Sequence, residues 1–563
     1  MKKLVMFVCS LSIFALSHAQ PFTYADTLRG SITPERAWWD VLRYDIEVKP
    51  DYQNKTIEGV TTIIFQTHCS GSKIMQVDLQ APLIIDSIQF YNKNVSFRNI
   101  DSNVYHVYLK NAEKKNYFID NYRRQGFMAN AITIYYHGKP TEAIKPPWDG
   151  GFVWAKDSLG RSWVSVACQG LGASVWYPCK DHQSDEPDMG ASLTIIIPDT
   201  LMAVGNGRLA SSKKNNDGTA TYKWEVKNPI NNYDIIPYIG KYVNFSDTLH
   251  GEKGILDLNY WVLDYNLEKA KNEFQQVKPM LHCFEYWFGP YPFYEDGYKL
   301  VDAPYLGMEH QSAVAYGNGY ENGYHGTDLS GTGWGMKWDF IIVHESGHEW
   351  FGNNITTKDI ADMWVHEGFT NYSETLYTEW LFGKQAGNEY NYGIRKNIEN
   401  KNPVISMYGV NRESEGTDKY YKAANMIHII RHVIDNDEKF RNILRGLNKT
   451  FYHATVTTKQ IEDYISKESG INFSKVFDQY LRDTLIPQLQ YYYTPDKKKI
   501  CYHWANCSKD FNMPLVLHSD IDSKSSRLSI SEKWKSTEQI TLFDTAWIEK
   551  NYYITIKEAA PNK

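Results

Sequence analysis

Two histidines stand four residues apart in the stretch FIIVHESGHEWFG, and a glutamate directly follows the first of them. Residues four apart lie on one face of an α-helix, so the imidazoles of His344 and His348 can converge on a single metal ion. Glu345 projects in a different direction, which suits a base acting on metal-bound water better than a further ligand. The spacing predicts a helical metal site for hydrolysis, with Gly352 and two asparagines ending the helix.

A catalytic zinc site also needs a third protein ligand. The next helical stretch, MWVHEGFTNYSETLYTEWLFG, offers Glu367, and Glu374 follows seven residues later on the same face. Two histidines and one glutamate would leave the fourth position open, as in catalytic rather than structural zinc sites. We therefore expect His344, His348 and Glu367 to bind zinc, one ion per chain. Glu374 would not bind the ion but would orient the side chains that do. The HExxH spacing by itself is moderate evidence, since helix-face histidines beside surface carboxylates are the alternative explanation.

The surrounding patterns predict three folded units. Short alternating runs such as RYDIEVKP and ASLTIIIP fill residues 36–245 and indicate an antiparallel β domain. Helical spacing starts near residue 262 and continues through the metal-site stretches, whereas alternation returns after Pro487. We accordingly divide the chain into 20–245, 246–486 and 487–563.

The first residues predict export. MKKLVMFVCSLSIFALSHAQ combines two lysines, a short apolar run and small residues near position 19, which is typical of a cleaved secretory signal over residues 1–19. The apolar run is too short to cross a bilayer, and no other segment could span one. We expect a periplasmic or extracellular protein without a membrane span in its mature chain.

The net charge argues against one class of function, and the cysteine spacing indicates one candidate disulfide. The 563 residues carry a net charge of −6 and show no basic stripe, which argues against nucleic-acid binding. An oxidising compartment permits disulfides, and the close spacing in CYHWANC makes Cys501 and Cys507 the best local candidate pair, although connectivity cannot be deduced from sequence.

A second histidine pair, His428 and His432, is interpreted as structural because no carboxylate base or third ligand is near it in the sequence.

Several motifs together resemble one enzyme family. HESGHEWFGN, the eighteen residues between His348 and Glu367, and EGFTNYSE are similar to the HExxH-x18-E signature of the M1 zinc aminopeptidases, the gluzincins that include aminopeptidase N and leukotriene A4 hydrolase. YLGMEHQS is similar to the family's GxMEN motif, WYPCKDHQSDEP to its FPCxDxP segment, and DKYYKAANMIHIIR to its YEKGA segment. The resemblance covers most of the chain.

The resemblance implies a role for each matching residue. Glu345 would be the general base, and Tyr420, rather than Tyr421, the tyrosine that stabilises the transition state. Glu309, with Gly307 and Met308 in the same motif, would bind the α-ammonium group of the substrate, assisted by Gln169. His310, His366 and Ala423 depart from the family pattern without removing a ligand, and His310 leaves the geometry of the amine pocket open.

The family resemblance also implies an architecture and an activity. We expect a multidomain α+β fold with a saddle-like N-terminal antiparallel β domain, a thermolysin-like catalytic domain and a small C-terminal β-sandwich. A short form of this kind would lack the large helical domain of many relatives and have a more open cleft. The implied function is removal of N-terminal residues from peptides with a free N-terminus; a catalytically inactive M1-like binding or scaffold protein is the alternative.

Overall fold

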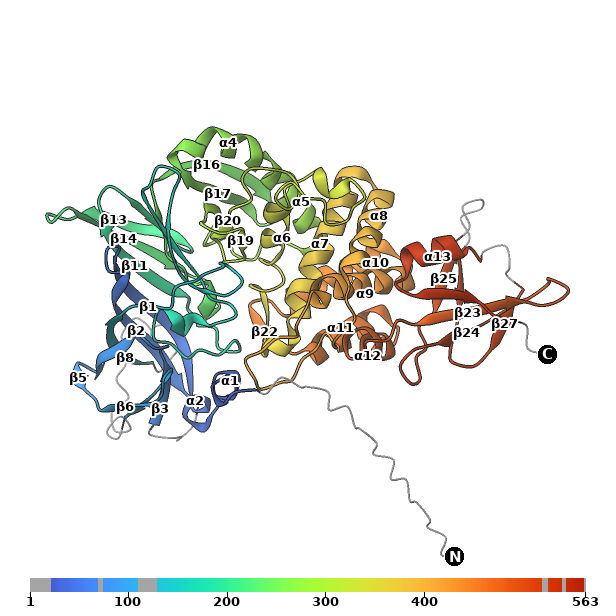
Figure 1. Ribbon diagram of the computed structural model, residues 1–563, viewed down its shortest axis with the longest axis horizontal. Coiled ribbons are helices and arrows are strands. Elements are labelled where there is room, and N and C mark those ends of the chain that lie inside the picture. Colours follow the sequence, from blue (N-terminus) through green and yellow to red (C-terminus); the bar gives the residue numbers. More distant parts are fainter. Residues whose placement is uncertain (1–21, 69–73, 110–128, 519–524, 539–542, 561–563) are drawn as a thin grey trace, which may run out of the picture.

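Three structural units follow one another along the elongated molecule (Figure 1). The computed structural model describes residues 22–68, 74–109, 129–518, 525–538 and 543–560. The predicted signal sequence lies outside these residues. None of the helices within the described ranges is long and apolar enough to span a membrane.

The N-terminal unit consists of β-sheets preceded by two short helices, α1 (Tyr24–Gly30) and α2 (Pro34–Ala37). Its largest sheet has the strand order β13-β14-β11-β1-β2-β8-β4-β5. The strands of this sheet are β1 (Trp39–Asp51), β2 (Thr56–Thr67), β4 (Ile84–Phe90), β5 (Lys93–Asn94), β8 (Asn130–Gly138), β11 (Ala191–Pro198), β13 (Arg208–Lys214) and β14 (Thr219–Val226).

Two smaller sheets complete this unit. One contains β9 (Gly151–Lys156), β10 (Ser162–Ala167), β12 (Met202–Val204) and β15 (Tyr238–Gly240), and the other contains β3 (Ile74–Asp78), β6 (Phe97–Asp101) and β7 (Val104–Tyr108). The largest sheet is mixed, since β1 and β11 run parallel with Tyr44 opposite Ala191. The prediction of a purely antiparallel domain is therefore wrong at this pair. Between β8 and β11 of this large sheet, the chain forms β9 and β10, which belong to a smaller sheet. A long connection rather than a hairpin therefore leads the chain back to the large sheet.

The middle unit combines a five-stranded sheet with a group of helices. The sheet order is β16-β17-β18-β20-β19, from β16 (Tyr242–Gly251), β17 (Gly254–Leu263), β18 (Tyr298–Asp302), β19 (Gly307–Met308) and β20 (Val314–Tyr316). The predicted boundary after residue 245 falls within β16. The helices are α4 (Leu267–Glu273), α5 (Val277–Phe288), α6 (Phe340–Gly347), α7 (Trp364–Phe382), α8 (Lys384–Ile394), α9 (Asp418–Ile434), α10 (Asp437–Thr450), α11 (Thr458–Ser469) and α12 (Ser474–Leu481). A two-stranded sheet of β21 (Ile355–Thr357) and β22 (Ala454–Val456) joins the segment after α6 to the segment after α10.

The C-terminal unit is a small β structure with one helix. Its four-stranded sheet has the order β27-β24-β23-β28, and β25 pairs with β26. The elements are β23 (Gln488–Tyr493), β24 (Ile500–Ala505), β25 (Leu515–His518), β26 (Ser525–Leu528), β27 (Lys535–Thr537), α13 (Thr545–Asn551) and β28 (Thr555–Glu558). The β character of this segment is as predicted, while its arrangement as a sandwich stays a prediction. Its buried side chains, Trp504 among them, belong to the same hydrophobic core as those of the middle unit.

The proposed disulfide between Cys501 and Cys507 is wrong, since both thiols are free. Cys501 lies in strand β24, which continues to Ala505. Four residues of extended chain already span about 13 Å, more than the separation that a disulfide tolerates. The extended strand therefore keeps these two cysteines apart in space although they are close in sequence.

Candidate metal centre and active site

Helix α6 presents the first part of the metal site. Asp339 caps its N-terminus and accepts hydrogen bonds from the amides of Ile341 and Ile342 at 2.9 and 3.2 Å. The helix ends at Gly347, earlier than the predicted stop at Gly352, and His348 occupies the C-cap position. A Cβ atom on Gly347 would lie 2.7 Å from Ser373 Oγ, so glycine allows α6 to approach α7 closely.

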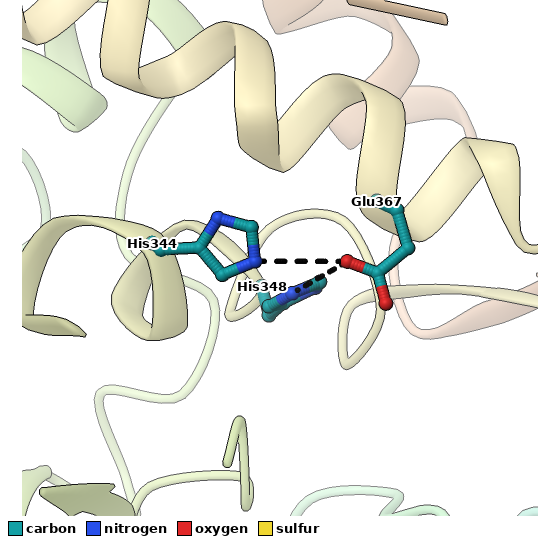
Figure 2. A group of neighbouring side chains, drawn as sticks. All are labelled: His344, His348 and Glu367. Carbon is teal, nitrogen blue, oxygen red and sulfur yellow. Dashed lines mark ion pairs between the residues drawn. The ribbon is translucent and has the colours of Figure 1, made fainter. Parts of the chain in front are cut away.

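Helix α7 brings the third ligand to the two histidines. Oε2 of Glu367 lies 3.6 Å from His344 Nε2 and 3.4 Å from His348 Nε2 (Figure 2). Donor atoms at about 2.0–2.2 Å from a tetrahedral zinc ion are separated by roughly 3.3–3.6 Å, so these distances fit one ion. All three side chains are buried, and Glu367 Oε2 accepts no hydrogen bond from the residues that the structure describes. The donor set and its spacing fit zinc.

The opposite nitrogen of each imidazole is held by the protein. His344 Nδ1 lies 2.7 Å from Glu374 Oε1, and His348 Nδ1 lies 3.0 Å from the carbonyl oxygen of Phe351. Because both partners are acceptors, each Nδ1 carries a proton, and each Nε2 faces Glu367, where it could give its lone pair to a bound metal ion. Glu374 thus occupies the supporting position that its place on α7 predicted.

The charges of the metal-free site favour cation binding. Burial disfavours the charged imidazole of His344, but Glu367 and Glu374 outweigh this effect and raise the pKa of His344 well above its ordinary value. Burial likewise opposes ionisation of Glu367, yet the two histidines lower its pKa. A bound metal ion would replace the protons that this cluster otherwise attracts.

Glu345 lies beside the metal ligands without being one of them. Its side chain is buried, and this burial raises the pKa of Glu345 to about 7. A Cβ atom on Gly307 would lie 2.7 Å from Glu345 Oε1, so the glycine of β19 leaves the space that the carboxylate occupies. A carboxylate with a pKa near neutrality is suited to exchange protons during catalysis.

Glu309 forms a second buried carboxylate next to Glu345. One ligand-type atom from each of Glu309, Glu345 and His348 lies within 4.8 Å of the other two. Glu309 Oε1 accepts hydrogen bonds from Gln169 Nε2 at 2.6 Å and from the Tyr233 hydroxyl at 2.8 Å. Gln169 therefore lies where the family resemblance placed it, whereas Tyr233 is an additional residue that the sequence interpretation missed.

The main chain of Glu309 is also fixed. Asn353 Nδ2 donates to the carbonyl oxygen of Glu309 at 2.8 Å, and Met308 precedes it in the short strand β19. The next residue, His310, is fully buried, and its Nδ1 atom lies 2.6 Å from the Tyr238 hydroxyl. His310, which departs from the family motif, thus directs a ring nitrogen toward Tyr238 of the N-terminal β unit.

Tyr420 lies at the start of α9, close to the metal ligands. Its ring centre is 6.1 Å from that of His344. Burial, followed by the negative charge of Glu367, raises the pKa of Tyr420 well above its ordinary value, so the hydroxyl stays protonated and can donate a hydrogen bond. Tyr421 follows it in the same helix at a ring-centre distance of 6.2 Å.

Three further histidines from the sequence analysis, His366, His428 and His432, make other contacts. His366 is buried, and its Nε2 atom accepts a hydrogen bond from the Thr357 amide at 2.9 Å. His428 and His432 are both buried, with their Nε2 atoms 3.1 Å apart. Within the described part of the chain, no group of three metal-ligating side chains includes either member of this pair.

Comparison with known proteins agrees with this fold. The Peptidase M1 N-terminal domain model matches residues 41–233, and the Peptidase family M1 domain model matches residues 273–480. These ranges hold Glu309, Glu345, Tyr420 and all three candidate metal ligands. The chain belongs to peptidase family M1.

Individual relatives are distant and longer. A probable aminopeptidase 2 from Sulfurisphaera tokodaii is 21% identical over 78% of this chain and 53% of its own length. Leukotriene A-4 hydrolase from Xenopus laevis is 23% identical over 53% of this chain and 48% of its own length. The chain thus spans about half the length of the curated relatives it matches.

A solved structure shows the same fold. A variant of the M1 zinc metallopeptidase from Deinococcus radiodurans superimposes with a TM-score of 0.64 at 18% sequence identity, covering 79% of this chain and 95% of that one. A second structure of that variant, bound to a Tyr-Ser-Ala substrate, gives a TM-score of 0.62.

Proposed function

We propose that this protein is an exported zinc aminopeptidase that removes the N-terminal residue from peptides with a free N-terminus. The observation that carries the proposal is the position of Glu309. Its carboxylate is buried, fixed by Gln169 and Tyr233, and adjacent to Glu345 and the metal ligands. A peptide chain that enters from Glu309 can place only its first carbonyl group at the metal site, because the α-nitrogen and that carbonyl carbon are about 2.5 Å apart.

The side chains divide the reaction among them. One zinc ion, held by His344, His348 and Glu367, would lower the pKa of water from 15.7 to about 7 and polarise the peptide carbonyl. Glu345 accepts the proton of the attacking water and returns it to the leaving amine. Tyr420 donates a hydrogen bond to the oxygen that becomes negative during attack.

Specificity for a free N-terminus rests on charge. Burial of the Glu309 carboxylate is costly without a cation, and a protonated α-amine supplies that cation. Its two neutral donors orient Oε1 without neutralising the charge. An N-acetylated peptide has no charge to offer and would leave Glu309 unpaired, so we expect it to be rejected.

Export is proposed from the N-terminal sequence alone. The basic, apolar and small-residue order of residues 1–19 supports cleavage of a secretory signal. The preparation for the assays below should therefore lack these residues, and the N-terminus of the exported protein can be determined by mass spectrometry.

Hydrolysis of paired chromogenic substrates tests the function. Purified protein should release the anilide from free aminoacyl anilides, lose activity with a chelator and recover it with zinc, and leave N-acetylaminoacyl anilides intact. Cleavage of the acetylated substrates would contradict the exopeptidase proposal. No cleavage of any aminoacyl anilide in the zinc-loaded protein would favour the inactive binding protein, although Glu345 and Tyr420 are both present beside the metal ligands.

A further inference from the structure

A cavity lies against the segment that follows the metal-binding helix. It has a volume of about 500 Å³ and is formed by the end of α5, helix α10 and the turn between β16 and β17. Asn354 belongs to its lining, only six residues after His348. Its size is in the usual range for small-molecule sites, about 300–1,000 Å³.

The cavity wall packs directly on the metal-binding segment. Phe288 lines the cavity, and its ring centre is 5.2 Å from that of Phe351, whose carbonyl oxygen holds His348 Nδ1. Gly289, also in the lining, accepts a hydrogen bond from Trp350 Nε1 at 2.9 Å. A molecule in the cavity would therefore contact residues that pack on the segment after His348, and neither Glu309 nor Glu345 belongs to the lining.

The charged side chains of the lining are all basic. They are Lys253, Arg445 and Lys449, in a chain whose net charge is −6. The charge of Arg445 is neutralised by Glu252, whose Oε1 and Oε2 atoms accept hydrogen bonds from the guanidinium group at 2.9 and 2.7 Å. Lys253 and Lys449 are exposed, and neither forms an ion pair with a carboxylate among the residues for which the structure gives positions; Lys253 Nζ donates to the Tyr452 hydroxyl at 3.5 Å. The cavity thus has two exposed lysines in its lining that form no ion pair with the described part of the protein and are available to an anionic ligand.

The rest of the lining is suited to an apolar group. Phe288, Pro290 and Tyr452 present ring surfaces, and Lys253 Nζ lies 4.7 Å from the centre of the Tyr452 ring. Asn354 and Asn448 add amide groups that are linked to each other at 3.0 Å. Apolar walls with a few polar and charged groups are the usual composition of a small-molecule site.

We propose that this cavity is a second ligand site, separate from the active site, for a small carboxylic acid with an aromatic or other apolar body. The carboxylate would pair with Lys253 and Lys449, and the apolar body would pack on Phe288, Pro290 and Tyr452. The proposal does not depend on peptidase activity, because it rests on the cavity and its charges alone.

Calorimetric titration with two matched probes tests the site. N-acetyl-phenylalanine carries a carboxylate and an aromatic ring but no α-ammonium, so the Glu309 site should not recognise it. N-acetyl-phenylalanine amide has the same shape without the charge. We expect saturable binding of one molecule of the acid per chain, with a Kd on the order of 0.1–1 mM, and binding of the amide at least tenfold weaker.

Variants locate the binding. The double substitution Lys253→Met and Lys449→Met should weaken binding of the acid at least tenfold, and Asn442→Trp, on the cavity lining, should fill the space and abolish it. Lys213→Met, an exposed lysine of β13, and Glu309→Gln should leave the Kd unchanged. Absence of saturable binding, equal affinity for acid and amide, or a loss of affinity in Glu309→Gln but not in the double variant would overturn the proposal. Thermal unfolding of each variant separates loss of the site from loss of the fold.

Discussion

The carboxylate of Glu374 lies 2.7 Å from His344 Nδ1, on the side of the imidazole away from Glu367. This contact fixes the tautomer of His344 and directs the Nε2 lone pair toward the metal site. Supporting partners of this kind typically change metal affinity by about 10–100-fold.

Replacement of Glu374 by alanine should therefore weaken zinc binding by about 10–100-fold while leaving the three ligands in place. Competition between the protein and a chromogenic chelator measures the zinc Kd. Glu268→Ala, an exposed residue of α4 that pairs with Lys271, is the control and should not change it. Equal zinc affinities in wild type and Glu374→Ala would contradict the assigned role.

Tyr420 and its neighbour provide a paired test of transition-state stabilisation. Tyr420→Phe removes the hydroxyl next to the metal ligands and should lower kcat by about 10²–10³ with a small change in KM. Tyr421→Phe should retain most of the activity, because its ring lies one position further along α9. If the two variants exchanged these effects, the assignment to Tyr420 rather than Tyr421 would be wrong.

Glu309 should determine recognition of the substrate amine. In Glu309→Gln, the substrate ammonium loses its charged partner, so kcat/KM for free aminoacyl anilides should fall about 30-fold or more, corresponding to about 2–5 kcal/mol. Tyr233→Phe removes one donor to the same carboxylate and should cause a smaller loss, about tenfold or less. Steady-state kinetics on one substrate series measures both. A larger loss in Tyr233→Phe than in Glu309→Gln would contradict the proposed recognition.

The buried amine of Lys299 should make the stability of the fold depend on pH. It is buried at the contact between β18 and the N-terminal unit, where its amine donates to the carbonyl oxygen of Gly207. Burial lowers the pKa of Lys299 from 10.5 to about 7. Between these pH values the unfolded chain binds more protons at this position than the folded chain, so the contribution of Lys299 to stability rises with pH.

The thermal unfolding midpoint of Lys299→Met should accordingly rise less between pH 7 and pH 9.5 than that of the wild type. Scanning calorimetry at both pH values checks this difference. Lys213→Met, which changes an exposed lysine of β13, should follow the wild type. Parallel pH curves for wild type and Lys299→Met would show that the amine titrates normally in the folded protein.

Local spacing predicted the parts of the site that lie close together in sequence. His344 and His348 belong to one helix and its cap, and Glu367 and Glu374 share the next long helix, so helical periodicity placed each pair on one face of its own helix. The alternating and helical stretches likewise indicated which parts of the chain form strands and which form helices. Each of these features depends on the periodicity of residues within a single element.

The remaining features depend on contacts between distant segments. Tyr233 reaches Glu309 across 76 residues of sequence, and no local pattern marks it. The parallel pairing of β1 and β11 and the early end of α6 at Gly347 likewise depend on how separate elements pack. Cys501 and Cys507 show the converse case, since a strand separates residues that are close in sequence.

The central claim is that His344, His348 and Glu367 hold one zinc ion on which activity depends. Zinc titration of the metal-free protein, followed by elemental analysis and by hydrolysis of a free aminoacyl anilide, tests it most directly. We predict that activity rises linearly to a plateau at one zinc per chain, and that Glu367→Gln reduces both zinc content and activity. Full zinc binding and activity in Glu367→Gln, or a plateau without zinc, would contradict the account.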